Sequence, residues 1–284
     1  MRRRSGFLPE AKIKGRMRLH QGAWLAWATG AAITAISTTN PFYLLLLCAI
    51  AWLVHAAHWE PGPASRSFKI FVLFAVGAIA IRTALVGLTP LVPNSASIGA
   101  GSFLSAFVEG LRLGTLLVVF GTFNSVSDPA SILKLAPRRF HEAGLAASLA
   151  LSIAPRTIET VGRVREAQRL RGIRFSRLRA LPALAVPVLE TGMEEALTLA
   201  ESMDARGHGR GARTRYRPDR WNLSSALLVA GALVAAVAFG IAFFDHSSTL
   251  SMPAFPIRWP EVSMLLIATE IALALPALLP RART

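Results

Sequence analysis

Two arginines, Arg171 and Arg206, each stand near the predicted end of a helix, and a glycine follows each of them. The two segments are Arg165–Gly172 (REAQRLRG) and Leu199–Gly207 (LAESMDARG). A guanidinium group is a rigid fork of N–H donors, and the helix dipole favours a cation at the C-terminal end. Such an end could dock into an acidic or carbonyl-lined groove of a partner protein. It could also belong to a solvated basic surface.

A second candidate lies in an apolar segment, where Glu109 and Arg112 stand three residues apart beside Gly110 and Gly114. Small residues four apart allow two membrane helices to approach closely. Ionisable side chains inside a span mark functional sites by default. The pattern predicts an intramembrane polar pair. That pair is either a functional site or an internal ion pair that fixes helix packing.

Motifs for other chemistry are missing. The chain has no G-x-x-x-x-G-K-[ST] phosphate loop, because no lysine follows a glycine. It shows no Ser/His/Asp arrangement, metal-ligand run or paired-carboxylate motif. His55 and His58 could share a helix face and bind a metal, but histidines at a span end are more often interfacial. We therefore expect no catalytic residues, no metal site and no cofactor bound by this chain.

The composition decides where these residues must lie. Hydrophobic residues make up 53% of the chain and the mean hydropathy is +0.46, which predicts an integral membrane protein. A net charge of +15 would suggest nucleic acid in a soluble protein. Here 17 of the 31 Lys/Arg lie between residues 128 and 220, separating apolar segments in the positive-inside pattern. We expect no nucleic-acid partner.

Cys48 is the single cysteine, so no internal disulfide forms.

The apolar segments predict an all-α membrane protein with about six transmembrane helices. The expected spans are residues 22–38, 42–59, 68–88, 102–123, 223–244 and 260–279. Basic residues avoid alternate loops, so both termini should be cytoplasmic in a multi-pass protein of the plasma (inner) membrane. The expected regions are a basic arm (1–21), a four-span region (22–124), a cytoplasmic helical region (125–220) and a two-span region (221–284).

Local signals place helices in the cytoplasmic region. Asp128 as N-cap and Pro129 at the first position predict a short helix. Longer helices are expected over about residues 139–171 and 187–206, each ended by a glycine. Both carry apolar faces. In the last half of the 139–171 helix the apolar positions drift around its surface, which suits crossing another helix rather than lying parallel to it.

Several of these motifs resemble the transmembrane T component of energy-coupling factor (ECF) transporters. The resemblance is strongest between Ser127 and Arg215. Weaker matches are Asn40–Leu47 (NPFYLLLL) and Gly110–Arg112 (GLR). The strong matches are Ser127–Pro129 (SDP), Leu149–Pro155 (LALSIAP), Arg165–Gly172 and Ala200–Gly207. The second arginine signature is intact, whereas the first carries Leu170 where the family usually has alanine.

The resemblance implies a division of labour among subunits. Two cytoplasmic ABC-type ATPases would use ATP and Mg²⁺, and a small membrane S component would bind the substrate. That substrate would be a vitamin such as biotin or a transition-metal ion such as cobalt or nickel. By this match the coupling residues are Arg171, Gly172, Ala205, Arg206 and Gly207. The apolar faces, which include Val161, Val164, Met193, Leu197 and Met203, would contact the S component.

Two other functions compete with this interpretation. A permease could carry substrate through its own helix bundle, which would need polar groups converging at mid-membrane. Glu109, Arg112 and Arg82 offer limited support for that. A membrane enzyme would need a catalytic constellation, and the sequence contains none that stands out. We therefore expect a coupling subunit in contact with lipid, two ATPases and one S component, with ATPase activity residing in the partners.

Overall fold

The computed structural model describes residues 19–59, 63–88, 100–133, 135, 140–172, 181–208, 221–251 and 259–278. Every regular element in these ranges is a helix, which confirms the predicted all-α fold. The chain divides into two compact units, residues 1–128 with 220–284, and residues 129–219. We call them the bundle unit and the central unit. Most of the predicted basic arm lies outside the described residues.

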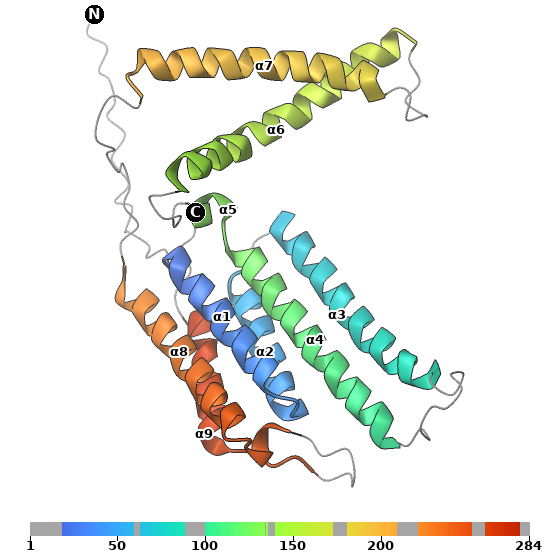
Figure 1. The fold of residues 1–284 in the computed structure, drawn as a ribbon, viewed down its shortest axis with the longest axis vertical. Coiled ribbons are helices and arrows are strands. Elements are labelled where there is room, and N and C mark those ends of the chain that lie inside the picture. Colours follow the sequence, from blue (N-terminus) through green and yellow to red (C-terminus); the bar gives the residue numbers. More distant parts are fainter. Residues whose placement is uncertain are drawn as a thin grey trace, which may run out of the picture. The chain divides into compact units, whose positions relative to one another are not determined.

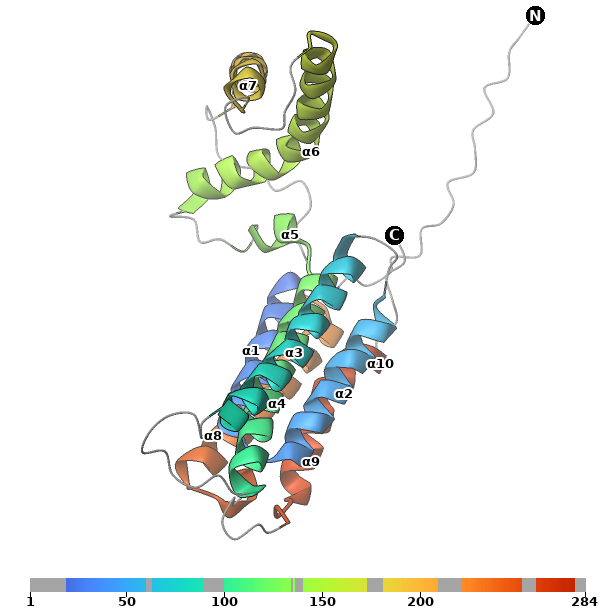
Figure 2. The ribbon, with the colours of Figure 1, turned by 90° about the vertical axis from the view of Figure 1, so that its right-hand side faces the viewer.

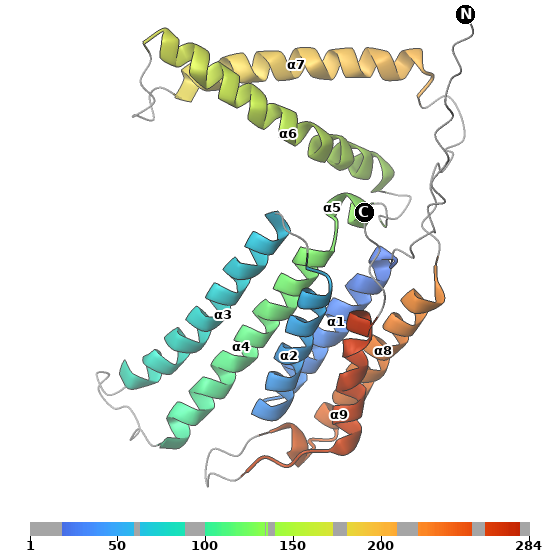
Figure 3. The same cartoon turned by 180° about the vertical axis from the view of Figure 1, so that it is seen from behind.

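The bundle unit contains a helix for each of the predicted apolar segments (Figures 1 and 3). α1 lies between α8 and α4, and α3 lies at the edge of the bundle beside α4 (Figure 1). The elements are α1 (Gln21–Ser37), α2 (Pro41–Ala57), α3 (Pro63–Leu88), α4 (Ala100–Val126), α8 (Leu223–Phe244), η4 (Ser248–Leu250), α9 (Met264–Ile271), η5 (Ala272–Ala274) and α10 (Leu275–Leu278).

Three helices in the described ranges are long and apolar enough to cross a membrane: Arg66–Leu88, Gly101–Val126 and Leu223–Phe244. Pro41–Ala57 and Met264–Leu278 are shorter apolar helices. Large apolar side chains cover the outward surface of the bundle instead of being confined to its core. On α3, for example, Leu73 and Phe74 are 71% and 64% exposed. This distribution is expected where lipid tails surround the helices, and it agrees with a membrane protein.

Small residues let α1 pack closely in the bundle. Ala31, Ala35 and Trp27 have no exposed surface. Gly30 lies against α8, where an added methyl group would come 2.7 Å from the carbonyl oxygen of Ala232. Helices in lipid gain little from the hydrophobic effect when they associate, so close van der Waals contact of this kind holds them together.

Asn40 joins the turn between α1 and α2 to the chain that follows α8. Its Oδ1 accepts from the Phe42 N–H at 3.0 Å and so caps α2, with Pro41 at the first helical position. Its Nδ2 donates to the carbonyl oxygens of Thr249 and Glu261 at 2.9 and 3.0 Å. The Asn40 side chain is completely buried. A single amide thus fastens this connection to two distant segments.

The last span begins at Met264, later than the predicted Pro260. Other segments hold the backbone groups just before it. The Ser263 N–H donates to the Tyr43 hydroxyl at 2.8 Å, and the Glu261 carbonyl accepts from Asn40 as described. With these groups engaged outside the segment, residues 259–263 are not helical.

A proline also disrupts the last span, which tightens into the 3₁₀ turn η5 between α9 and α10. Pro276 has no N–H, so it cannot donate to the Leu273 carbonyl three residues earlier. The indole N–H of Trp27 on α1 donates to that oxygen instead, at 2.8 Å in a buried position. A side chain from another helix thus replaces a missing backbone donor.

The central unit consists of α5 (Pro129–Leu133), α6 (His141–Leu170) and α7 (Leu181–Ala205). α5 begins directly after Asp128, as predicted. α6 bends along its length (Figure 2) and contains Pro155, which accounts for a bend because proline removes one hydrogen bond and clashes with the preceding turn. α7 crosses the C-terminal half of α6 (Figures 1 and 3). The crossing geometry that the sequence indicated is confirmed.

The predicted start of the last central helix was wrong. α7 begins at Leu181 and continues through Pro187, the predicted first residue. Proline at that position leaves the Ala183 carbonyl without its donor four residues later. The helix continues through the proline, and Gln168 of α6 supplies a donor to this oxygen.

Candidate functional site

α6 ends at the first predicted arginine. The Arg171 N–H still bonds to the Ala167 carbonyl at 3.2 Å, so Arg171 is the C-cap residue. Gly172 follows in the left-handed region, with φ of 81°, and its N–H donates to the Arg169 carbonyl at 2.9 Å. This is the inner hydrogen bond of a Schellman motif, in which glycine ends the helix by turning the chain aside.

α7 ends in the same manner, with both hydrogen bonds of the Schellman motif. The Gly207 N–H donates to the Asp204 carbonyl at 2.8 Å, and the His208 N–H donates to the Met203 carbonyl at 3.0 Å. Gly207 has φ of 72°. Arg206 is therefore the C-cap residue, equivalent to Arg171 on α6. The predicted helix ends at the two glycines are confirmed, because residues within one turn determine them.

The helix ends present their arginines to the surroundings of the unit. Arg171, Gly172, Ala205 and Arg206 are exposed and Gly207 is half-buried. Because α6 and α7 run in opposite directions, their two C-terminal ends lie at opposite ends of the crossed pair (Figures 1 and 3). α7 has 25 residues, which makes it about 37 Å long. The structure thus provides two separate arginine tips.

Gln168 is a functional candidate that the sequence analysis missed. It is buried, with 9% of its surface exposed, although Ala167 and Arg169 on either side of it are exposed. Its Nε2 donates to the Ala183 carbonyl of α7 at 3.2 Å. The signal that could have revealed it was Pro187, which lies within an otherwise helical pattern and must release a carbonyl.

The apolar face of α7 points away from α6. Val186, Leu189, Met193 and Leu197 follow one another at spacings of three or four and are between 61% and 68% exposed. Met203, which was assigned to the same face, is half-buried. An exposed apolar row of this length on a helix outside the bundle unit is a candidate contact surface.

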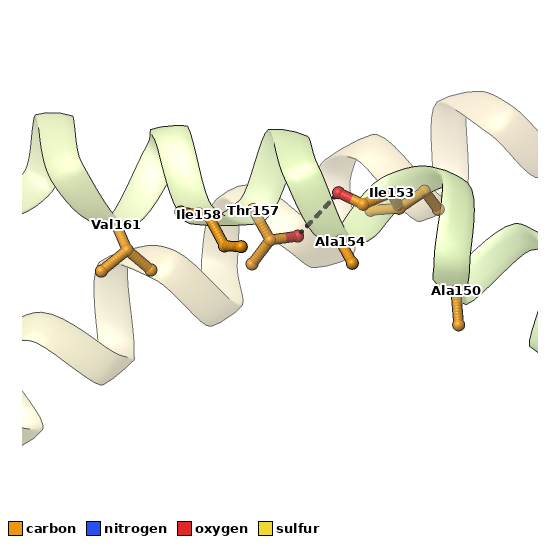
Figure 4. A pocket seen from close by; sticks show the side chains of 6 residues that line it. All are labelled: Ala150, Ile153, Ala154, Thr157, Ile158 and Val161. Atoms are coloured by element: carbon orange, nitrogen blue, oxygen red, sulfur yellow. Dashed lines mark hydrogen bonds between the residues drawn. The ribbon is translucent and has the colours of Figure 1, made fainter. Parts of the chain in front are cut away.

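α6 carries a shallow apolar groove beside its proline (Figure 4). Val161 lines this groove, and Val164 does not. Val164 is half-buried one turn before Gln168. The Thr157 hydroxyl donates to the Ile153 carbonyl at 3.3 Å, which leaves the groove surface mostly apolar. The lining residues are Ala150, Ile153, Ala154, Thr157, Ile158 and Val161.

The predicted intramembrane pair of Glu109 and Arg112 does not form. Arg82 of α3 donates through Nε to Glu109 Oε2 at 2.9 Å, and its Nη2 also contacts this oxygen. Arg112 instead donates through Nη2 to the Ile36 carbonyl near the end of α1. Both charged residues of α4 therefore join different helices. The alternative interpretation, that polar groups here fix helix packing, agrees with these contacts, but the partner was wrong.

Close packing of α3 on α4 explains the change of partner. A methyl group added to Gly110 would come 2.9 Å from the Ile79 Cα and 3.4 Å from the Arg82 Cβ. At Gly114 it would meet Ile79 again, at 3.2 Å. The close approach expected from these two glycines is confirmed, and it brings the Arg82 side chain beside Glu109.

His55 of α2 and its C-cap residue His58 make separate contacts. His55 Nδ1 lies 2.9 Å from the Ser125 hydroxyl, and its ring stacks on Phe68 with 3.6 Å between centroids. His58 packs edge-on against Trp24. Each ring is thus oriented by a different neighbour.

Glu270 is a buried residue that sequence analysis did not single out. It lies on α9 with no exposed surface, and neither carboxylate oxygen accepts a hydrogen bond from the described residues. Its isolated position in an apolar segment was the available signal, because a charge there is costly unless it is paired.

No protein-family model matches the chain. It is 26% identical over 232 residues to the energy-coupling factor transporter transmembrane protein EcfT of Streptococcus equi, covering 77% of this chain and 83% of that protein. It is 28% identical over 254 residues to the EcfT protein of Listeria innocua, covering 84% and 92%. It is 31% identical over 151 residues to that of Bacillus subtilis, covering 48% and 56%. These similarities confirm the resemblance seen in the central motifs: the chain is related to the transmembrane T component of energy-coupling factor transporters.

Proposed function

We propose that this chain couples ATP hydrolysis by two cytoplasmic ABC-type ATPases to uptake of a vitamin or transition-metal ion held by a membrane S component. Relatives named as transmembrane proteins of energy-coupling factor transporters support membership in such a complex. In this proposal the chain itself binds no nucleotide, and ATP and Mg²⁺ are used by the partner subunits. Residues 125–220 form the cytoplasmic coupling region.

The pair of exposed arginine tips carries this proposal. Arg171 and Arg206 occupy equivalent C-cap positions at opposite ends of one crossed helix pair. One tip for each ATPase gives two separate contacts. The left-handed glycines turn the chain away, so each guanidinium is free to enter a groove and donate to several acceptors at once.

The apolar surfaces of the central unit provide the proposed contact for the S component. Met193 and Leu197 are 68% and 63% exposed, and Val161 lies in the apolar groove of α6. A partner with its own apolar helices would remove these side chains from water, at about 25 cal/mol for each Å² buried. Val164 and Met203 are half-buried and contribute less area to this surface.

Co-purification tests the proposal. The tagged chain, expressed together with ATPases and a small membrane protein encoded near it, is expected to recover both after mild detergent extraction. The matched control is the same chain carrying Arg171→Ala and Arg206→Ala, which should insert in the membrane and lose the ATPases. A stable homo-oligomer of the wild-type chain that carries substrate into vesicles on its own would support the permease alternative instead.

Orientation in the membrane gives a separate prediction. In a Cys48→Ala background, cysteine at Asp245, at the end of α8, should react with an impermeant maleimide in intact cells. Cysteine at Glu195 on α7 should react only after permeabilisation. Both positions are exposed in the structure, so accessibility depends on the side of the membrane. Labelling of Glu195→Cys in intact cells would contradict cytoplasmic coupling helices and the cytoplasmic termini deduced with them.

A further inference from the structure

α7 contains a backbone acceptor that its own helix does not satisfy. Within a helix the Ala183 carbonyl would accept from the N–H four residues later, but that residue is Pro187. α6 has the same defect at Pro155, where the released carbonyl belongs to Leu151. Leu151 is exposed, so water can reach that part of the helix. At Ala183 a protein side chain supplies the donor.

Gln168 supplies it. Its Nε2 lies 3.2 Å from the Ala183 oxygen, and the residue is 9% exposed. Thr160, Val164 and Gln168 are spaced four apart on α6 and are all buried or half-buried, so they form one stripe along the helix. Thr160 accepts a hydrogen bond from Arg163 of the same helix. Of these three residues, Gln168 is the one with a described hydrogen bond to α7.

This contact lies beside the first arginine tip. Gln168 precedes Arg171 by three residues, so the two lie about one turn apart, near 4.5 Å along the axis. Fixing Gln168 on the α7 backbone therefore fixes the last turn of α6. A backbone carbonyl that would be satisfied within an ordinary helix would accept this bond less readily, so the proline and the glutamine act together.

We propose that Gln168 is a positioning residue: it replaces the donor that Pro187 lacks, and so holds the crossing of α6 on α7 and the direction of Arg171. The effect on ATPase binding rests on the proposed coupling function. The contact between Gln168 and the Ala183 carbonyl does not. The bundle unit holds a comparable pair in Trp27 and the Leu273 carbonyl beside Pro276.

Spin-label distances test the Gln168–Ala183 contact without any partner subunit. The full-length chain in lipid nanodiscs, with Cys48→Ala, carries labels at Glu166→Cys on α6 and Glu195→Cys on α7, both exposed positions. Gln168→Met keeps the length of the side chain and removes its donors, so it should broaden the distance distribution. Thr160→Val is the matched control, a buried change on the same stripe that should leave the distribution unchanged.

Pro187→Ala gives the decisive comparison, because it restores a backbone N–H to the Ala183 carbonyl. In that background Gln168→Met should broaden the distribution far less. The proposal would be overturned if Gln168→Met alone leaves the distance distribution unchanged. It would also be overturned if Gln168→Met broadens the distribution equally in the wild-type and Pro187→Ala backgrounds.

Co-purification of the ATPases then tests whether the Gln168–Ala183 contact matters for coupling. Gln168→Met should lower recovery of the ATPases roughly 2- to 10-fold, the range expected for one hydrogen bond, and Pro187→Ala should relieve that loss. Unchanged recovery despite a broadened distribution would overturn the positioning of Arg171. If the wild-type chain recovers no ATPase, the proposed function fails. The spin-label distances still test the Gln168–Ala183 contact in that case.

Discussion

Arg171→Ala and Arg206→Ala should each lower recovery of the ATPases and the rate of substrate uptake by about 10-fold or more, while membrane insertion is unchanged. A hydrogen bond to a charged group contributes about 1.5–3 kcal/mol. Both arginines are exposed C-cap residues, and backbone hydrogen bonds hold the two helix ends. Alanine should therefore leave α6 and α7 intact. The measurement is co-purification together with uptake by cells that express the complex.

The two losses should be separable. Because the tips lie at opposite ends of the helix pair, the double variant should lose roughly the product of the single effects. Lysine should rescue only partly, because an ammonium group cannot reproduce the planar fork. Arg165→Ala and Arg169→Ala are matched controls, since both are exposed arginines on α6 close to the tip. If these controls are as damaging as Arg171→Ala, diffuse positive charge explains the contact and specific tips do not.

Asn40→Ala should destabilise the bundle unit by about 3 kcal/mol or more. The change removes the cap of α2 at Phe42 and both donors to the carbonyls of Thr249 and Glu261. The Asn40 side chain has no exposed surface, so no solvent replaces the lost hydrogen bonds. The measurement is thermal unfolding of the detergent-solubilised protein, followed by loss of the monodisperse species.

Two variants calibrate that result. Asn40→Ser keeps a side-chain oxygen that can cap α2 and loses the two amide donors, so its stability should fall between those of wild type and alanine. Thr29→Ala removes an exposed hydroxyl that bonds only within its own helix, to the Leu25 carbonyl, and should change stability by less than about 0.5 kcal/mol. Equal stability of Asn40→Ala and Thr29→Ala would show that Asn40 does not fasten the outer segments.

The sequence by itself determined features that depend on residues close together along the chain. The helix ends at Gly172 and Gly207 were predictable, because a Schellman motif needs only a glycine and the turn before it. The start at Asp128 and the turn at Asn40 follow from the same kind of local chemistry. The apolar segments predicted the membrane helices because lipid demands length and hydropathy, which the chain displays directly.

The tertiary structure decided which distant groups satisfy one another. Glu109 has Arg112 three residues away, yet it pairs with Arg82, because Gly110 lets α3 approach closely enough to compete. Nothing in the local pattern around Glu109 specifies that approach.

The prolines show the same division most clearly. A proline ordinarily indicates the start or end of a helix, and Pro187 was interpreted in that way. α7 nevertheless continues through it, and Gln168 of α6 donates to the Ala183 carbonyl that the proline leaves free. Likewise, the last span departs from regular α-helix just before Pro276, where Trp27 of α1 donates to the Leu273 carbonyl. A local pattern states which backbone group has lost its partner, but only the packed structure provides a new donor, since that donor comes from another helix.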